Sequence, residues 1–468
     1  MRTVTFGILL ASTIRIAAAE PTVRAGAYAM DVTPPAFPIS VNGNMADRLA
    51  TRATDPMHAR CIVFGTPAVT VAMVTVDSCM LPRELIDSAK AQAEKLTGIP
   101  AKHILISATH THTAPASTGV FQSDANDGYV RFLPGKIAEG IAKAKDAMTD
   151  ATVGAAAADE PSQLFNRRWK LKPGTMPPNP FGTSDDLVKM NPGVGNPNLV
   201  EPAGPVDPGV TVLAFRKADG TPIALHANYS LHYVGDLPPL SADYFGVFCE
   251  LIGPAIGAKP PFVAVLSNGT SGDVNNVDVR GTPTKTQPGE NCRRVAAVVS
   301  AAAKRAYENV RFVRDPLVAV VEKEIELKVR KPNDAELARA KDILAKAGPG
   351  VLKGLDAIYA RETVLMAKYP DTVKLKLQAI RIGDTAICAV PCEVFADIGL
   401  TLKKKSPFGT TFTISLANGY NGYLPTPEQH KLGGYETWRA RSSYLEVTAS
   451  ETIVATMFDL LAQLRQMK

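Results

Sequence analysis

The sequence of 468 residues predicts an α/β fold in which a mixed β-sheet core is flanked by helices. Two observations carry this prediction. In the first half of the chain, apolar β-branched runs alternate with segments of helical periodicity, an order typical of α/β proteins. The runs are apolar at nearly every residue, as expected for strands that are covered on both faces. A hydrophobic content of 46% is sufficient for a large core.

The first four elements show this alternation. The run TVAMVTVD ends on the carboxylate of Asp77, and the helical segment that follows ends on a glycine stop. Pro134 is expected to interrupt the second helix early, because proline lacks the backbone donor of a helix interior. In order, we expect a strand at 70–77, a helix at 83–98, a strand at 103–107 and a helix at 131–148.

Between residues 166 and 210 the composition changes, and Pro, Gly and Asn become frequent. So long an irregular stretch is usually either a functional loop or disordered. Regular patterns return beyond it. Asn333 and Glu336 have the spacing of a capping box, and Gly383-Asp384 is a hairpin turn signal. We expect strands at 210–217 and 222–230, a buried strand that runs into a Gly-rich turn within 261–273, a helix at 333–348, a hairpin at 376–391 and a terminal helix at 450–466.

The N-terminus has the form of a secretory signal peptide covering residues 1–19. Arg2 is followed by an apolar stretch, and AAA precedes Glu20. No later run approaches the ~20 apolar residues of a membrane span. We therefore expect no transmembrane segment, a secreted or periplasmic protein, and one mature domain at 20–468 with a Pro/Gly-rich loop insertion at 166–210.

The charge distribution argues against nucleic-acid binding, and the cysteine spacing argues against a structural zinc cluster. The net charge is +6, and the basic residues do not form a block interleaved with aromatic residues, so nucleic-acid binding is not indicated. The six cysteines are widely spaced and form no CxxC, which argues against a structural zinc cluster. Buried free thiols are the favoured interpretation, although one or two disulfides of unknown pairing remain open.

The stretch ISATHTHTAP, residues 106–115, contains the strongest chemical signal. In an extended chain His110 and His112 point to the same face, so both imidazoles are aimed at one place. Imidazole is a common zinc ligand, and catalytic zinc takes about three protein ligands. Further ligands must come from elsewhere in the chain. The candidates are His226, His232, His430 and Glu393, with Asp77 and Asp273 at the ends of other predicted strands, where open α/β sheets build their sites.

Several motifs together resemble the catalytic domain of the neutral (non-lysosomal) ceramidases. In chain order they are DVTPP, ISATHTH, FNRR, SLHYVGD…SADYFG, SNGTSGDVNN, AVPCEVF and LANGYNGYLPTPEQH…YE, from about Gly26 to about Glu436. The resemblance implies a ceramidase-like α/β catalytic domain and a zinc-dependent amidase. Such an enzyme uses zinc-activated water to cleave the N-acyl bond of ceramide, a step of sphingolipid metabolism.

The resemblance also implies roles for individual residues. His110, His232 and Glu393 correspond to zinc ligands, and Tyr423 corresponds to an unusual phenolic ligand. Among the catalytic groups, His112 would lie beside the reacting carbonyl and could protonate the leaving amine. Arg167 matches an arginine near the site, with a loop salt bridge as its alternative role, and Tyr435 matches a tyrosine that helps to hold the oxyanion.

The sequence departs from the family pattern in two ways. Asn275, in GDVNN, stands where ceramidases carry a serine, and asparagine cannot act as a nucleophile. Ser271, four residues earlier, is an alternative to the family's serine, although it does not align with it. Second, nothing here corresponds to the family's C-terminal immunoglobulin-like domain. Both departures weaken the prediction that ceramide is the substrate more than the prediction that zinc is the metal.

Two other interpretations stay open at this point, and a third is disfavoured. The same zinc scaffold could act on a carbohydrate or another polar compound, which would suit Asn275 and the polar loop at 166–210. The chain could be an inactive binding protein. An amidohydrolase barrel shares the H-x-H motif, but its eight βα units do not fit the strand count. The substrate is expected to be a small or lipid-like molecule, and the sequence leaves the oligomeric state open.

Overall fold

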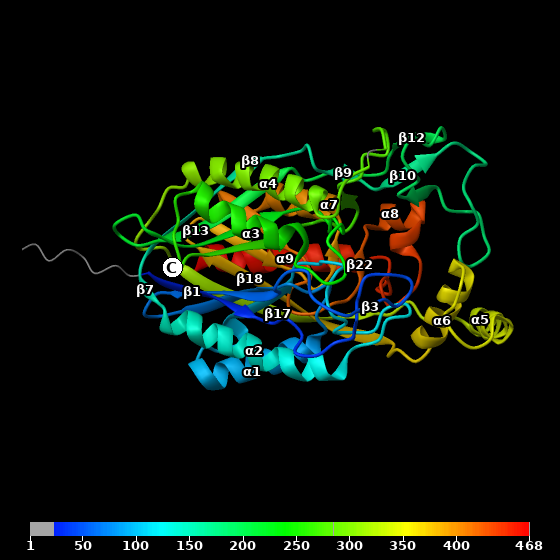
Figure 1. Cartoon of the computed structure of the whole chain (residues 1–468), viewed down its shortest axis with the longest axis horizontal. Helices are drawn as coiled ribbons and strands as arrows, with labels where there is room; N and C mark the ends of the chain where they lie inside the picture. The colour runs from blue at the N-terminus through cyan, green and yellow to red at the C-terminus, as the bar shows by residue number, and fades with distance from the viewer. Residues whose placement is uncertain (1–22, 284, 468) are drawn as a thin grey trace, which may run out of the picture.

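The computed structural model describes residues 23–283 and 285–467, and the predicted signal peptide lies outside these residues. The α/β class is confirmed: three β-sheets form the core and helices cover their outer faces (Figure 1). Figure 1 shows α1 and α2 below the sheets and α3 and α4 above them.

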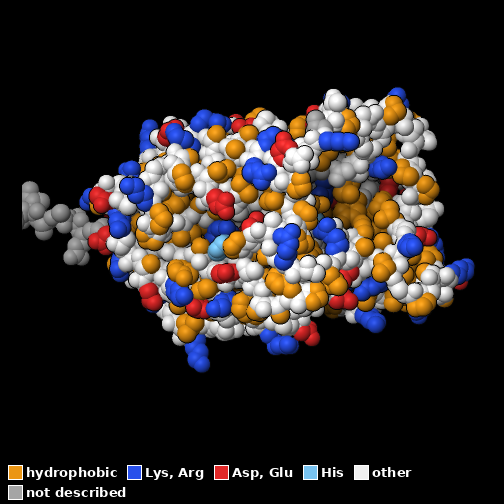
Figure 2. Space-filling model, in the orientation of Figure 1, with side chains coloured by type: hydrophobic (Ala, Val, Ile, Leu, Met, Phe, Trp, Pro, Cys, Tyr) orange, Lys and Arg blue, Asp and Glu red, His pale blue; other side chains and the backbone are white. Residues whose placement is uncertain are grey.

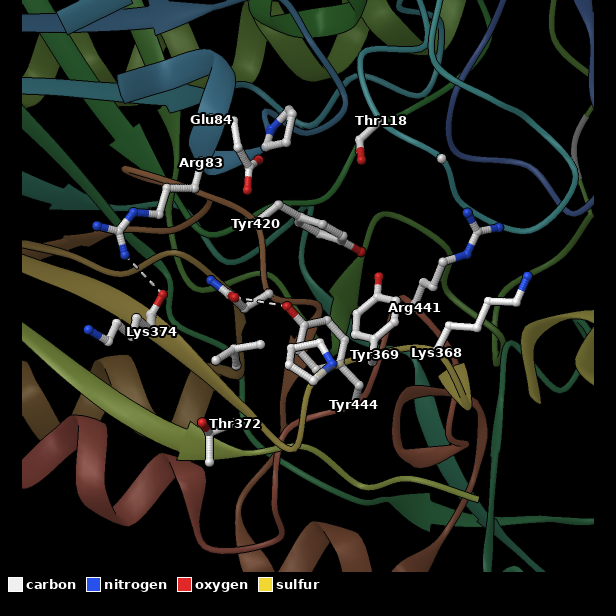
Figure 3. Close-up of a pocket in the computed structure, with 15 residues that line it drawn as sticks. Arg83, Glu84, Thr118, Lys368, Tyr369, Thr372, Lys374, Tyr420, Arg441 and Tyr444 are labelled. Carbon is white, nitrogen blue, oxygen red and sulfur yellow. Dashed lines mark hydrogen bonds between the residues drawn. The ribbon is translucent and has the colours of Figure 1, made fainter. Parts of the chain in front are cut away.

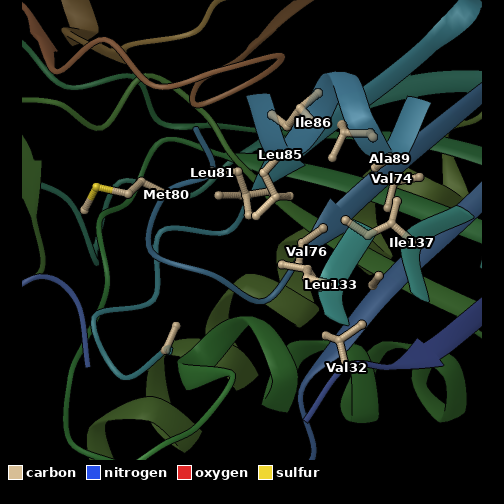
Figure 4. Packing of buried hydrophobic residues seen from close by; sticks show 14 of the residues in the cluster. Val32, Val74, Val76, Met80, Leu81, Leu85, Ile86, Ala89, Leu133 and Ile137 are labelled. Carbon is tan, nitrogen blue, oxygen red and sulfur yellow. The ribbon is translucent and has the colours of Figure 1, made fainter. Parts of the chain in front are cut away.

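The first sheet has five strands and carries α1 and α2 on one face. The sheet is mixed, because β5 and β6 are parallel and the other pairs are antiparallel. In Figure 4, Ile86 of α1 and Leu133 and Ile137 of α2 lie near Val74 and Val76 of the sheet, within one buried cluster. The order is β6 (Ile104–Ala108), β5 (Thr70–Val76), β4 (His58–Gly65), β1 (Arg24–Asp31) and β7 (Thr149–Asp150), with α1 at Arg83–Thr97 and α2 at Asp127–Asp146.

The second and third sheets have four strands each, and each is also mixed. Helices α3 and α4 contact the second sheet, while α9 and α7 contact the third. The second sheet runs β15 (Val263–Asn268), β14 (Pro222–Tyr229), β13 (Gly209–Arg216) and β8 (Thr152–Asp159), with α3 at Asp243–Ala255 and α4 at Glu290–Glu308. The third runs β17 (Val318–Lys328), β18 (Thr372–Ile382), β19 (Thr385–Ala389) and β21 (Thr410–Ile414), with α7 at Ala396–Lys405 and α9 at Ala449–Gln466.

One hydrophobic cluster joins the three sheets. Phe64 of the first sheet, Phe215 of the second and Phe412 of the third all belong to it and are buried. Phe64 and Phe215 are in direct ring contact, with centroids 5.1 Å apart. Burying side chains of this size contributes ~1.5–3 kcal/mol each. This shared core fixes the three sheets relative to one another.

The segment 166–210 contains regular structure. Three of its strands form a small sheet in the order β11-β10-β12, and β9 pairs with β16. The bounds are β9 (Phe165–Asn166), β10 (Arg168–Leu171), β11 (Val188–Met190), β12 (Leu199–Pro202) and β16 (Val274–Asn275). The remaining short elements are β2 (Ile39–Ser40), β3 (Leu49–Ala50), η1 (Ala101–His103), α5 (Asp334–Ala347), α6 (Leu355–Met366), β20 (Glu393–Val394), β22 (Tyr423–Leu424), α8 (Pro427–Leu432) and η2 (Tyr435–Thr437).

Local signals explain several boundaries. Helix α1 ends at Gly98, whose left-handed φ of 72° lets its N–H close the last turn, and Asn333 and Glu336 form the expected capping box of α5. The expectation for α2 was wrong. The helix begins at Asp127, capped by the Asn126 side chain, and continues through the buried Pro134 to Asp146. Tertiary packing here overrides the local cost of proline.

All six cysteines are free thiols, as favoured, and five of them are buried. Within residues 23–283 and 285–467, no helix is both long and apolar enough to cross a membrane.

Candidate metal centre and active site

Each of the three sheets delivers one side chain to a common point. His110 follows β6 of the first sheet, His232 follows β14 of the second, and Glu393 follows β19 of the third. All three side chains are buried, and their ligand atoms lie within 4.8 Å of one another. These residues are up to 283 positions apart in the sequence, and the fold brings them together because the ends of the three strands lie close to one another.

The distances within this cluster suit a metal ion. The Nε2 atom of His110 lies 3.1 Å from His232 Nε2 and 3.1 Å from Glu393 Oε2, and the distance from His232 Nε2 to Glu393 Oε2 is 4.0 Å. A tetrahedral zinc with bonds of about 2.0–2.1 Å separates its ligand atoms by about 3.3 Å. The cluster therefore has the dimensions of a zinc site.

Hydrogen bonds orient both imidazoles toward the centre. His110 Nδ1 donates to the carbonyl oxygen of Cys79 (2.7 Å), and His232 Nδ1 donates to that of Ser271 (3.1 Å). These bonds assign the proton to Nδ1 and leave the Nε2 lone pairs facing each other. Glu393 Oε2 has no hydrogen-bond partner although it is buried. Two imidazole nitrogens and a carboxylate oxygen that converge in a buried site are the donor set of a metal ion, so the residues fit a metal.

The electrostatics of the cluster favour positive charge at the same point. Burial works against protonation of His110, but the Glu393 carboxylate outweighs burial and raises the pKa of His110 to about 10. Burial, reinforced by Arg167 and His110, lowers the pKa of His232 well below its usual value. Without a metal the cluster therefore holds a proton on the His110–Glu393 pair, and a metal ion would replace that proton.

His110 reaches the cluster through an unusual backbone conformation. Its φ is 72°, in the left-handed region that non-glycine residues rarely adopt. The expectation that His110 and His112 converge as alternate residues of an extended strand was therefore wrong, because β6 ends at Ala108. The two rings still meet, edge to face, with 3.2 Å between their Nε2 atoms. Strain of this kind is typical of functional sites.

His112 is held by its neighbours on both sides. Its ring stacks on Tyr233, with centroids 3.7 Å apart and an interplanar angle of 12°. On the other side, a Cβ at Gly43 would lie 2.5 Å from the ring, so glycine is needed there for space as well as for its φ of 96°. Burial and the adjacent His110 and Arg167 lower the pKa of His112 well below its usual value. His112 is therefore neutral at pH 7.

Arg167 is fixed by a buried ionic network. Glu436 accepts from Arg167 Nε (2.8 Å) and from Arg168 Nη1 (2.6 Å), and all three side chains are at most 4% exposed. Burial opposes ionisation of Glu436, but the two guanidinium groups outweigh it and lower the pKa of the carboxyl. The network points Arg167 Nη1 at His232 Nε2 (3.3 Å). Arg167 thus forms the salt bridge given as its alternative role, and the same guanidinium also reaches the cluster.

Tyr423 and Tyr435 lie on the same side of the cluster as Arg167. Tyr423 is the strand partner of Glu393 in the β20–β22 pair, and the Arg167 guanidinium lies 5.3 Å from its ring centroid. The rings of Tyr423 and Tyr435 are 5.7 Å apart. Burial and the nearby Glu393 raise the pKa of both phenols, so both are protonated at neutral pH in the metal-free protein.

A pocket opens onto these side chains. Its volume is about 280 Å³, and His112, Arg167, His232, Tyr423, Tyr435 and Asn275 are among its lining residues. Asn275 donates to Asn191 Oδ1 (2.7 Å) and so holds one wall. Ser271 does not line this pocket, and its hydroxyl donates to Asn268 Oδ1 (2.7 Å). Ser271 therefore fits a supporting role for His232 rather than that of a substitute nucleophile.

An apolar pocket of about 360 Å³ adjoins the first. The two share Met45, Met190 and Tyr435. Figure 2 shows a hollow with hydrophobic side chains on the right of the molecule, where Figure 1 places the small β10–β12 sheet and α6. The other apolar residues of this pocket are Met176, Pro177, Pro178, Val188, Leu355 and Trp438.

Four sequence candidates lie outside the cluster. His226 is buried on β14, where its ring contacts Phe412, and burial lowers its pKa to about 3. His430 lies on α8. Asp77 forms a buried ion pair with Arg60 (2.5 Å), and Asp273 accepts from Asn166 and from the Ala396 backbone. These carboxylates join segments of the fold instead of binding the cluster.

Sequence reasoning missed three residues that support the site. Glu436 holds Arg167, Gly43 makes room for His112, and Tyr420 donates its hydroxyl to Glu393 Oε1 (3.0 Å). Glu436 and Tyr420 both lie within the last quoted motif, next to residues that were assigned roles. A charged residue beside Tyr435 was the available signal for Glu436.

Replacing Glu436 with glutamine is expected to destabilise the protein by about 3–5 kcal/mol, because Arg167 and Arg168 would lose their buried counter-charge. Glu201→Gln, which removes the charge from an exposed pair with Lys170, is the matched control and should cost less than about 1 kcal/mol. Urea unfolding of both variants measures the difference. Equal losses would show that the Glu436 network does not stabilise the fold.

Comparison with known proteins agrees with this architecture. Two solved structures superpose on the chain. Neutral ceramidase from Pseudomonas aeruginosa matches with a TM-score of 0.70 and 16% identity, and the match covers 96% of this chain and 75% of that one. A ceramidase described as complexed with C2 matches with a TM-score of 0.71 and 15% identity, and the match covers 96% of this chain and 76% of that one. No family model and no curated protein sequence matches the chain. The chain therefore has the fold of the neutral ceramidases over nearly all of its length.

Proposed function

We propose that this chain is an exported zinc-dependent hydrolase that cleaves an N-acyl amide bond of a lipid-like substrate. The observation that carries the proposal is the convergence of His110, His232 and Glu393, one from each sheet, on a point with the dimensions of a zinc site. Tyr423, beside Glu393, is the proposed fourth ligand. The signal peptide expected at residues 1–19 supports export.

A zinc ion held by these residues would supply Lewis acidity, lowering the pKa of coordinated water and polarising the acyl oxygen. The protein supplies the other catalytic functions. Neutral His112 can accept a proton at Nε2 from the attacking water and deliver it to the leaving nitrogen. The protonated Tyr435 hydroxyl and the Arg167 guanidinium can donate hydrogen bonds to the oxygen that gains negative charge. None of these roles requires a serine nucleophile, so Asn275 is compatible with the proposed reaction.

The apolar pocket next to Tyr435 favours an acyl or other hydrocarbon chain as one part of the substrate. The polar pocket over the cluster favours hydrogen-bonding groups around the scissile bond. A second candidate, hydrolysis of a polar substrate such as a glycan, is favoured by the paired amides of Asn191 and Asn275 at the wall of the polar pocket. The two functions differ in their substrate: the first requires a hydrocarbon chain and the second does not.

The direct test measures zinc content and the hydrolysis of a fluorescent N-acyl sphingosine by the same preparation. We expect one zinc per chain, and loss of both zinc and activity in His232→Ala. His226→Ala is the matched control, because His226 is an equally buried histidine outside the cluster. A folded wild-type protein without zinc would refute the proposal, whereas activity on glycans alone would select the second candidate.

Zinc affinity is expected to rise with pH. Since the pKa of His110 is raised to about 10 in the metal-free protein, a proton must leave when zinc binds at pH 6–9. Apparent affinity should therefore increase about tenfold per pH unit over this range and level off near pH 10. Competition with a chelator of known affinity measures this slope. Glu393→Gln removes the charge that raises the pKa and should flatten the slope, and a wild-type affinity independent of pH would contradict the account.

A charge in the apolar pocket should discriminate against long acyl chains. Met176→Glu is expected to raise KM for a long-chain N-acyl amide about tenfold, the equivalent of nearly two buried methylene groups at ~0.8 kcal/mol each, with little change for an N-acetyl amide. Thr175→Glu is the matched control, because Thr175 does not line the pocket. Equal effects on both chain lengths would exclude this pocket as the chain-binding site.

A further inference from the structure

Figure 3 shows the residues that line a cavity of about 570 Å³, which is larger than either pocket of the proposed active site. Its lining includes Tyr420, whose hydroxyl donates to Glu393 Oε1. It has no residue in common with the two active-site pockets. Its volume is in the range of pockets that hold small organic ligands.

The cavity carries an excess of positive charge at one end. Four cationic side chains line it, against one acidic side chain, Glu84. Two of the cations are neutralised nearby: Arg83 pairs with Asp87 and Glu324, and Lys374 pairs with Glu324. Of the other two, Arg441 pairs with the buried Glu362, and Lys368 has no ion pair among the described residues. Figure 3 shows both on the same side of the cavity.

Arg441 is held with part of its guanidinium available. Its Nε and Nη2 atoms donate to the buried Glu362 carboxylate at 2.7–3.2 Å, and Nη2 also donates to the Phe121 carbonyl oxygen (2.9 Å). Within the described part of the chain no hydrogen bond is found for Nη1. That atom lies against Gly119, where a Cβ would approach it to 2.6 Å. The support from Glu362 fixes the guanidinium in the wall of the cavity and leaves Nη1 as an oriented donor.

Aromatic side chains form another part of the wall. Tyr369, Tyr420 and Tyr444 all line the cavity, and the rings of Tyr369 and Tyr444 pack at 5.3 Å with an angle of 61°. The Tyr444 hydroxyl is already bonded to Asn421, as the dashed line in Figure 3 shows. The Tyr369 hydroxyl has no such partner among the described residues and lies at the cationic end of the cavity in Figure 3.

We propose that this cavity is a binding site for a small organic anion. Arg441, Lys368 and the Tyr369 hydroxyl hold its phosphate or carboxylate group, and the tyrosine rings pack against a ring that carries this group. Oriented guanidinium donors and a mobile lysine are a common combination for oxyanion recognition. The proposal does not depend on zinc or on hydrolysis, because none of the three anion-holding side chains belongs to the metal cluster.

Calorimetric titration with phenyl phosphate, and with phenol as the uncharged analogue, tests the site. Titrations use the full-length protein as purified and again after dialysis against a chelator, so that phosphate bound to a metal ion is recognised. Lys368→Met and Tyr369→Phe are the variants, since both leave the buried Arg441–Glu362 pair intact. Lys259→Met, an exposed lysine outside the cavity, is the matched control.

We expect one phenyl phosphate per chain with and without metal, and much weaker binding of phenol. Lys368→Met should weaken binding about fivefold, the effect of one partly solvated charge, and Tyr369→Phe about tenfold, the effect of a hydrogen bond to an ion. Lys259→Met should change nothing. Absence of binding to the chelator-treated protein would overturn the proposal, as would equal affinities for the wild type and both cavity variants.

Discussion

The site depends on one constraint: the ends of strands from three different sheets must meet within a few ångströms. His110, His232 and Glu393 follow strands of three different sheets, so no single supersecondary unit can form the cluster. The shared core around Phe64, Phe215 and Phe412 sets the positions of the sheets, and the strand ends then bring His110, His232 and Glu393 together.

Bringing these groups together without water has an energetic cost, and the structure shows where it is offset. Carbonyl groups bind the outer nitrogens of both histidines, Tyr420 binds one oxygen of Glu393, and Glu436 neutralises the guanidinium of Arg167. The second oxygen of Glu393 faces His110 Nε2 at 3.1 Å, at the point where the two Nε2 atoms also converge. A cation at that point completes the electrostatics of the site.

Much of this arrangement could be predicted from the sequence. Apolar runs and helix signals located most of the strands and helices that build the three sheets, and the quoted motifs located the residues around the cluster. Local pattern could not predict the left-handed backbone at His110 or the continuity of α2 through Pro134, because tertiary contacts impose both. The small sheet within 166–210 was also missed, since its strands are short and separated by Pro- and Gly-rich turns.

The supporting network was the least predictable part. Glu436 and Tyr420 act through Arg167 and Glu393, and apart from the position of Glu436 beside Tyr435 the sequence has no signal for these pairings. Likewise, the cavity lined by Arg441 and Lys368 combines five segments that only the fold brings together: the start of α1, the loop at Thr118 and Gly119, the start of β18, the loop at Tyr420 and Asn421, and the chain near Arg441. Residue types can be read from the sequence, but the convergence of three sheets cannot.

Anomalous diffraction at the zinc absorption edge, from crystals grown with zinc, tests the central claim most directly. The account predicts one strong peak within about 2.0–2.2 Å of His110 Nε2, His232 Nε2 and a Glu393 oxygen. A folded protein with these three side chains in place and no peak between them would contradict it.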